Sequence, residues 1–495
     1  MRRLFNLKGL LIILALGALF YSQLPLGTAF LFGSDEGCEL MKAAMCNHGF
    51  KLYTDIWSDQ PPIFTLVLCQ VFKTFGASLL VGRLVAAFFG LLLFGAFFWL
   101  VERRLGLWQA LLATLLLVAA PNMALLSASV MLEVPAFATA LLAACLLFQW
   151  SKGKRTRWLF ASGMVMGIAL QIKLTSILIV PAMLAEIAFV CKSPSGRDWR
   201  KHACLAAIKW GTAVMMTFLI ITLAWARGSI LSTWRSHFAE QSIPGLNSAN
   251  DFPFHFELLE NHVECVLAAI AGVILVIRWR QWREMAFPLV FLATVSAIHA
   301  VHRPWWDYYY LHFAIPLAWL SALAIGEAIS SAARQLASSH YRSTSRKTWQ
   351  GILLCTLAAV VLVRSERRLE SNLTDLRARP SAASNPVVAQ MLKFASQTHW
   401  VYAEQDIYPF HAGLKTPPEL TVVVFKRFWS RQLSVPELVD TCRRYQTEQL
   451  VLNPAHLTSE WNDLLVDYNA VYQDTNAILY VAKRIAGQQQ AKHSN

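Results

Sequence analysis

The chain has 495 residues, of which 56% are hydrophobic and only 15% are charged, and Trp and Phe are abundant. Soluble domains carry about 25% charged residues, so this composition excludes an ordinary soluble protein and indicates a membrane protein. The net charge of +14 comes largely from Lys and Arg clusters between apolar runs, which is typical of cytoplasmic loops, so we expect no nucleic-acid partner.

Apolar runs recur from the N-terminal region to residue 364. A helix of roughly 20 residues crosses a hydrocarbon core of about 30 Å. We predict a polytopic α-helical membrane protein with about eleven spans, at 9–31, 79–101, 107–126, 134–150, 157–172, 175–191, 203–226, 262–278, 286–301, 311–329 and 350–364. Basic linkers such as 152–157 mark the cytoplasmic side, which places the loop 33–78 and the C-terminal region outside.

The first outer loop, residues 33–78, is expected to hold two short helices. In "EGCELMKAAMCNHG", apolar residues recur at helical spacing from Leu40 to Met45, and Gly49 stands where a helix would stop. This pattern predicts an amphipathic helix on the membrane surface. The segment "QPPIFTLVLCQVFKTFG" (60–76) predicts a second helix, because a Pro pair suits a helix start and the apolar run is too short to span comfortably.

The C-terminal region, residues 365–495, has no apolar run long enough to span a membrane. Its β-rich segments are "WVYAEQ", "LTVVVF", "QLVLNP" and "AILYVAK", and "VPELVDTCRRY" reads as an amphipathic helix. The alternation predicts an extracytoplasmic α/β domain with an accessory role. We therefore divide the chain into a transmembrane domain, 1–364, and a soluble domain, 365–495.

Two carboxylates, Asp35 and Glu36, stand directly after the first apolar run. Aspartate is a good N-cap, and acidic residues favour a helix N-terminus electrostatically. Spacing alone makes capping the simplest role for Asp35. A general base at the membrane surface remains the other interpretation of the same residue.

The stretch "SDEGCELMKAAMCNHGFKLYTDIWSDQPPIFTLVLCQVFKTFGASLLVGRLVAAFFG" resembles the first outer loop of the polytopic GT-C glycosyltransferases. The similarity is to the group of protein O-mannosyltransferases, aminoarabinose transferases and RgtA/B/C/D-like proteins. In that group an acidic pair opens the loop, a "G…Y.D….(K/Q)PP" segment follows, and "FG.S….R" precedes the second span. Four later segments resemble the same proteins: "ASVMLEVPAF", "GIALQIKLTSILIVP", "HRPWWDYYYLHFAIP" and "AEQDIYPFHAGLKTPPEL".

The resemblance implies transfer of a sugar from a polyprenyl-phosphate donor to an acceptor hydroxyl of a glycan, lipid or protein. The reaction would take place at the outer face of a membrane, which we expect to be the bacterial inner membrane. A hydroxyl is a poor nucleophile, so a carboxylate would take its proton; the resemblance makes Asp35, with Glu36, the catalytic candidate. Glu133 would position the acceptor or, in metal-dependent members, bind a metal.

We expect that sugar transfer from a polyprenyl-phosphate donor requires no cofactor. No cluster of His, Cys, Asp and Glu in the sequence marks a metal site, and a divalent metal stays an open alternative.

The departing polyprenyl phosphate needs cations at the same depth in the membrane. The candidates on the outer side are Arg83, Lys173, Arg303 and His312. Lys173 interrupts two short apolar halves, which indicates a functional cation, although a Lys snorkelling to the headgroups explains the same pattern.

Substrate contacts are expected from Asp59 and Gln60, which precede the Pro pair, and from Tyr310 in "WWDYYY". Many relatives have Lys in place of Gln60, where it is implicated in holding donor phosphate, and an uncharged amide puts that role in doubt. The aromatic run either stacks on sugar faces or lies at the membrane interface.

A transporter or flippase for lipid-linked glycans would also have many spans and few buried charges. Such proteins usually contain internal repeats, and we find no convincing repeat in this sequence. A glycan ligase or polymerase would share the donor type. A transferase and a transporter can be told apart by the fate of the donor, because a transferase cleaves it and a transporter leaves it intact.

Overall fold

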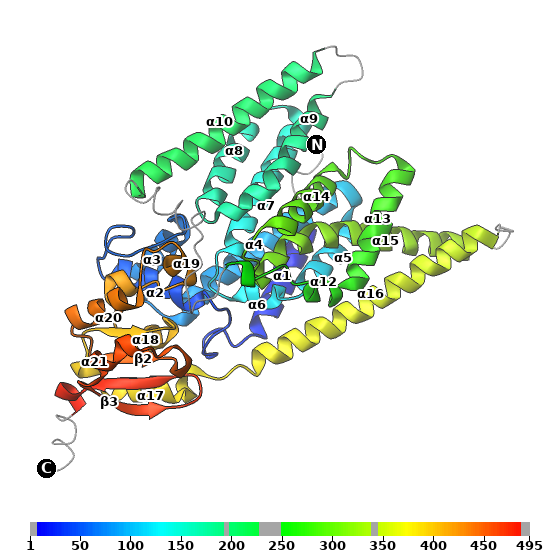
Figure 1. Cartoon of the computed structure of the whole chain (residues 1–495). Helices are drawn as coiled ribbons and strands as arrows, with labels where there is room; N and C mark the ends of the chain where they lie inside the picture. The colour runs from blue at the N-terminus through cyan, green and yellow to red at the C-terminus, as the bar shows by residue number, and fades with distance from the viewer. Residues whose placement is uncertain (1–6, 193–197, 227–248, 338–344, 487–495) are drawn as a thin grey trace.

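The computed structural model describes residues 7–192, 198–226, 249–337 and 345–486. Figure 1 shows a bundle of helices with a small sheet domain at one end, where α2 and α3 also lie, and the long helix α16 leads toward that domain. The bundle consists of α1 (Leu7–Ser22), α4 (Leu79–Leu105), α5 (Leu107–Val118), α6 (Met123–Ala128), α7 (Glu133–Gly153), α8 (Thr156–Leu170), α9 (Val180–Cys191), α10 (Trp199–Trp225), α12 (Glu257–Glu260), α13 (Val263–Trp279), α14 (Ala286–Val301), α15 (Tyr310–Ala337) and α16 (Ser345–Arg377).

Each predicted span overlaps a helix of the bundle, but the span 107–126 is divided between α5 and α6, and the span 175–191 begins in the 3₁₀ helix Leu174–Ile179. In the described ranges, five helices are long and apolar enough to cross a membrane: Leu79–Leu105, Glu133–Gly153, Leu174–Cys191, Trp199–Trp225 and Asp307–Ala333. The total of eleven crossings stays a prediction. The expected first span, 9–31, was too long, because α1 ends at Ser22 and the chain then turns. At the other end, α16 continues unbroken past residue 365 to Arg377.

Small residues let the helices of the bundle approach closely. A Cβ atom on Gly163 would lie 2.6 Å from the carbonyl oxygen of Trp210, and one on Gly167 would lie 2.7 Å from that of Val214. The α8 and α10 backbones therefore touch, as small residues permit in membrane helices.

The two predicted helices of the outer loop are confirmed as α2 (Glu36–Asn47) and α3 (Ile63–Phe75). Gly49 follows α2 with φ of +97°, a conformation that glycine adopts without strain. The location of α2 on the membrane surface stays a prediction, but the helix is covered by protein and does not lie there alone. Residues on most sides of α2 are buried, because α18 (Ile407–Ala412) of the C-terminal region packs against it.

The C-terminal region forms a four-stranded sheet with short helices packed around it (Figure 1). The strands are β1 (Val401–Ala403), β2 (Gln449–Leu452), β3 (Tyr468–Gln473) and β4 (Ile478–Ala482), in the order β1-β2-β4-β3. Strands β1 and β2 are parallel, and the other two pairs are antiparallel. Besides α18, the helices are α17 (Pro386–Lys393), α19 (Phe425–Trp429), α20 (Val435–Arg444) and α21 (Asn462–Leu465).

Three of the four predicted β-rich segments contain strands, and the predicted helix is α20, which begins with a capping box between Ser434 and Glu437. The strand prediction for "LTVVVF" is wrong. Arg427 donates to the carbonyl oxygens of Glu419 and Val422, so these backbone groups are satisfied without a neighbouring strand. Strand β3 was missed because its sequence "YNAVYQ" is largely exposed and lies at an edge of the sheet.

The sheet domain docks on α2 through close backbone and side-chain contacts. Gly37 faces the backbone of α18, where a Cβ atom would lie 2.6 Å from the nitrogen of Ile407. The thiol of Cys38 donates to Asp406 Oδ2 at 3.1 Å. His411 bonds the carbonyl oxygen of Phe30 at 2.9 Å. The domain is therefore fixed to the start of the outer loop.

Gly37→Ala should loosen the docked domain, because the rigid backbone of α18 cannot yield to a methyl group as a flexible side chain could. We expect faster cleavage of the C-terminal domain by limited proteolysis of the detergent-solubilised protein. Gly211→Ala is the matched control, because no atom lies within 4 Å of a Cβ built there. Equal cleavage rates for the two variants would show that the close approach at Gly37 does not hold the domain.

Titration of the buried Asp406 carboxyl should make the free energy of unfolding depend on pH. Burial raises the pKa of this carboxyl from its ordinary 3.8 to about 8. From about pH 4 to about pH 8, the folded state therefore keeps a proton that the unfolded state has lost, and stability falls as the pH rises through this window. We expect the melting temperature to drop more between pH 5 and pH 8 in the wild type than in Asp406→Asn. Parallel pH profiles would contradict this role.

Candidate active site

The outer loop is organised by a buried ion pair between Glu36 and Arg83, both of which are 0% exposed. Arg83 Nε and Nη2 donate to the two carboxylate oxygens at 2.9 and 2.7 Å. The same carboxylate accepts from the backbone of Phe32 and Val130. Arg83 Nη1 donates to the carbonyl oxygens of Leu26 and Ala29 at 3.1 and 2.8 Å. The pair thus joins the start of α2 to α4 and to two irregular segments.

These bonds leave neither partner available to a substrate. The predicted roles of Glu36 in catalysis and of Arg83 in binding donor phosphate do not fit this geometry. A bidentate pair with its remaining lone pairs and protons satisfied is the arrangement that a buried charge requires. Both residues therefore support the fold of the loop.

Asp35, the neighbour of Glu36, is in a different situation. It occupies the N-cap position of α2, yet its side chain makes no capping hydrogen bond. Its carboxylate is partly exposed and accepts a 3.3 Å hydrogen bond from the hydroxyl of Ser34. A purely capping role would require a hydrogen bond from the α2 backbone to the Asp35 side chain, and this bond is absent.

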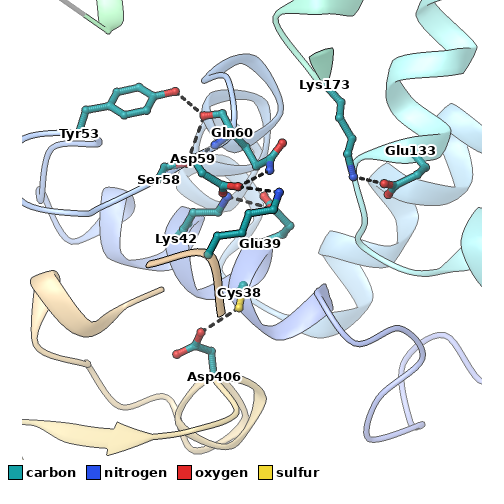
Figure 2. A network of polar contacts seen from close by, with 11 residues as sticks. Cys38, Glu39, Lys42, Tyr53, Ser58, Asp59, Gln60, Glu133, Lys173 and Asp406 are labelled. Carbon is teal, nitrogen blue, oxygen red and sulfur yellow. Dashed lines mark hydrogen bonds and ion pairs between the residues drawn. The ribbon is translucent and has the colours of Figure 1, made fainter. Parts of the chain in front are cut away.

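Glu133 and Lys173 form a second buried ion pair, which Figure 2 shows with the two side chains pointing toward each other. Glu133 is the first residue of α7, and Lys173 lies between α8 and the 3₁₀ turn η1 (Leu174–Ile179). Lys173 is 6% exposed, which is inconsistent with a side chain that snorkels to the headgroups. Both residues interact electrostatically with Asp35, so the three residues lie in one region.

Two tyrosine rings lie close to the Lys173 ammonium, and a buried histidine packs behind one of them. The Lys173 nitrogen lies 4.5 Å from the ring centre of Tyr308 and 5.7 Å from that of Tyr309. His312, which we predicted to bind phosphate, is buried, stacks on Tyr309 and shares a 2.9 Å hydrogen bond with His299. The rings place Lys173 where water is largely excluded.

A third ion pair joins Glu39 and Lys42 within α2, and both residues are buried. Figure 2 shows it beside Asp59 and Gln60, whose backbone carbonyl accepts from Tyr53 at 2.6 Å. The Gln60 amide donates to Asp59 Oδ2 at 2.9 Å.

Tyr308 connects this cluster to the Lys173 region. Its ring lies against Lys173, and the carboxylates of Asp35, Glu133 and Asp59 all act on its pKa. The two groups of charges therefore border one polar region at the junction of the loop and the bundle.

Two further predicted residues make their hydrogen bonds elsewhere. Tyr310 is buried and bonds His262 at 2.7 Å, on the side of α15 that faces α13. The prediction that Tyr310 binds substrate therefore does not fit; its neighbours Tyr308 and Tyr309 face Lys173 instead. Arg303 donates to the carbonyl oxygen of His302 and makes no contact with the acidic residues of the polar region in the described ranges.

Several residues of the polar region were not predicted. They are Glu39, Lys42, Tyr308, Tyr309 and Lys426, the last from the C-terminal domain. The only signal available was for the two tyrosines, which belong to the same aromatic run as Tyr310. Tyr308 and Tyr309 lie in a 3₁₀ turn (Asp307–Tyr309), and Tyr310 is the first residue of α15, so the change of helix type between them separates their directions.

Two carboxylate oxygens of the region, Glu39 Oε2 and Glu133 Oε2, are buried and have no hydrogen-bond partner among the described residues. Unsatisfied buried acceptors are costly and call for a donor, and the hydroxyl groups of a sugar are donors of this kind. No group of three or more His, Cys, Asp or Glu within the described ranges is placed to hold a metal ion.

The chain is similar to known proteins in sequence and in fold. Residues 59–225 match the family model described as dolichyl-phosphate-mannose-protein mannosyltransferase. The crystal structure of ArnT from Cupriavidus metallidurans bound to undecaprenyl phosphate has a TM-score of 0.63 at 15% identity, covering 96% of this chain and 98% of that one. Its apo structure has a TM-score of 0.62 at 15% identity, covering 95% and 97%. Curated protein sequences give no match.

These similarities confirm the predicted resemblance. The chain has the fold of the GT-C membrane glycosyltransferases, and it is an integral membrane protein. In particular, nearly its whole length aligns with ArnT, including the C-terminal region that follows α16.

Glu36→Gln should destabilise the folded protein, because it leaves the charge of Arg83 buried without a counter-ion. Breaking a buried pair from one side typically costs about 3–5 kcal/mol. We expect a lower melting temperature and lower yield of folded protein. Glu366→Gln on the exposed surface of α16 is the control. If Glu36→Gln melts like the wild type, the pair does not organise the loop.

Proposed function

We propose that the protein is a glycosyltransferase that moves a sugar from a polyprenyl-phosphate donor to an acceptor hydroxyl, with Asp35 as the general base. The proposal rests on the exposure, hydrogen bonding and location of the Asp35 carboxylate. This carboxylate is partly exposed, makes no cap, and lies near the buried Glu133–Lys173 pair. A partly exposed carboxylate in the same region as a buried cation is suited to accept a proton while the cation stabilises the leaving group.

In the proposed reaction, the acceptor oxygen attacks C1 of the donor sugar. Its proton passes to the Asp35 carboxylate as the new C1–O bond forms. The bond between C1 and the phosphate oxygen breaks, and its electron pair leaves with the polyprenyl phosphate. Electrons and protons balance without a cofactor.

Lys173 would stabilise the negative charge that grows on the departing phosphate. Electrostatic stabilisation is stronger where water is excluded, and Lys173 lies among Tyr308, Tyr309 and the buried Glu133. We assign Glu133 the task of holding Lys173 in position with one oxygen. Its second oxygen, unsatisfied among the described residues, would accept from a sugar hydroxyl.

The polyprenyl-phosphate class of donor is supported by the shared fold with ArnT, whose structure contains undecaprenyl phosphate. A lipid carrier also suits the position of the polar region, because the outer loop follows directly on the membrane helix α1. We propose that this region and the C-terminal domain face the outside of a bacterial inner membrane. The identities of the sugar and the acceptor are left open.

Donor cleavage tests the proposal. Membranes that contain the protein should release polyprenyl phosphate from a radiolabelled polyprenyl-phosphate sugar when acceptor is present. A transporter or flippase would move the donor without cleaving it, so an intact donor together with its translocation would overturn the proposal.

Asp35→Asn should fold but transfer almost nothing. Asparagine occupies an N-cap about as well as aspartate, so we expect a stability change within about 1 kcal/mol. An amide cannot take the proton, and loss of a general base lowers a rate by about 10²–10⁴-fold. The readout is initial transfer rate at equal protein abundance, with Asp375→Asn on the exposed face of α16 as control. Near-normal transfer by Asp35→Asn would exclude it as the base.

A further inference from the structure

Lys426 belongs to α19 of the C-terminal domain, yet its ammonium lies in the polar region of the outer loop. Lys426 Nζ is 3.3 Å from Asp59 Oδ2, the same oxygen that accepts from the amide of Gln60. The Lys426 side chain is 21% exposed, while Asp59 is buried. A positive charge from a distant part of the sequence thus lies beside Gln60, where the loop itself supplies only an uncharged amide.

Neighbouring contacts fix the position of Lys426. Arg427, next to it in α19, is bonded to backbone carbonyls of its own domain, and its guanidinium lies 5.0 Å from the ring centre of Trp57 in the outer loop. Trp57 Nε1 in turn donates to Gln432 Oε1 at 2.7 Å. Trp57 of the loop therefore contacts α19 through Arg427 and the residues just after α19 through Gln432, and these contacts hold the segment that carries Lys426 against the loop.

Lys426 also approaches the surroundings of Lys173. Its charge acts on the pKa of Tyr309 and of His302, and the ring centre of Tyr309 lies 5.7 Å from Lys173 Nζ. The charges of Lys173 and Lys426, which come from different domains, therefore both act on the pKa of Tyr309. A phosphate group has several acceptor oxygens and can be bound by two cations at once.

We propose that Lys426 is a second phosphate-binding residue of the donor site, and that it exchanges Asp59 for the donor phosphate on binding; this rests on the proposed function. Asp59 keeps the ammonium in place before the donor arrives, and it retains the hydrogen bond from Gln60 afterwards. The C-terminal domain then completes the donor site, whereas the sequence predicted only an accessory role for it.

The test is binding of undecaprenyl phosphate to the purified full-length protein in detergent micelles, with undecaprenol as the probe that lacks the phosphate. A hydrogen bond to a charged group is worth about 1.5–3 kcal/mol, so Lys426→Gln should bind undecaprenyl phosphate roughly 10- to 100-fold more weakly. Lys426→Arg should stay within a few-fold of the wild type. Lys415→Gln, which removes a lysine stacked on Trp400 of the same domain, is the control and should bind normally.

Asp59→Asn separates phosphate binding from a purely structural role. If Lys426 binds phosphate, this variant releases the ammonium and should bind undecaprenyl phosphate at least as tightly as the wild type. If the Lys426–Asp59 pair only docks the domain, Asp59→Asn and Lys426→Gln should weaken binding alike and should both expose the domain to protease. That second result would overturn the inference.

Failure of the inference is distinguishable from failure of the proposed function. Normal binding by Lys426→Gln, with binding lost in Lys173→Ala, would reject Lys426 and leave the proposed function standing. Equal affinity of the wild type for undecaprenyl phosphate and undecaprenol would reject the phosphate site as a whole.

Discussion

The buried ion pair between Glu36 and Arg83 is the interaction on which the rest of the site depends. A buried charge is tolerated only where a partner and hydrogen bonds replace its hydration. In this pair, Glu36 accepts hydrogen bonds from the backbone N–H groups of Phe32 and Val130. Arg83 donates to the backbone carbonyl oxygens of Leu26 and Ala29. The ion pair thereby fixes the start of α2 against α4. Asp35, one residue earlier, lies at the edge of the polar region, and its carboxylate makes no capping hydrogen bond to α2.

Charge pairing continues through the polar region, where Glu133 meets Lys173, Glu39 meets Lys42, and Asp59 meets Lys426. Each pair neutralises charges that would be costly alone in a region of low dielectric. The pairs come from the loop, the bundle and the C-terminal domain, so the region exists only when all three parts are assembled. The buried location of α2, with Gly37 against the backbone of α18, follows from the same requirement.

Much of the fold could be predicted because long apolar runs and helix-terminating residues act locally. The helices of the bundle, α2, α3 and α20 follow from such patterns. The Glu36–Arg83 pair could not be predicted, since its partners are 47 positions apart and each also fits a catalytic role in the sequence. Adjacent residues can also have different surroundings, which the sequence does not show. Asp35 is partly exposed while Glu36 is buried. Tyr309 faces Lys173, while Tyr310 faces His262. Lys426 carries no local signal at all, because only docking of the domain brings it to Asp59.

The most direct measurement is the structure of the full-length protein with undecaprenyl phosphate bound, determined by electron cryo-microscopy in lipid nanodiscs. We expect the phosphate within about 3 Å of Lys173 Nζ, on the side of the polar region that Asp35 faces, with the polyprenyl chain leading into the membrane. A phosphate bound elsewhere, with the Glu133–Lys173 pair undisturbed and Asp35 remote from the lipid headgroup, would contradict a donor site at the junction of the outer loop and the bundle.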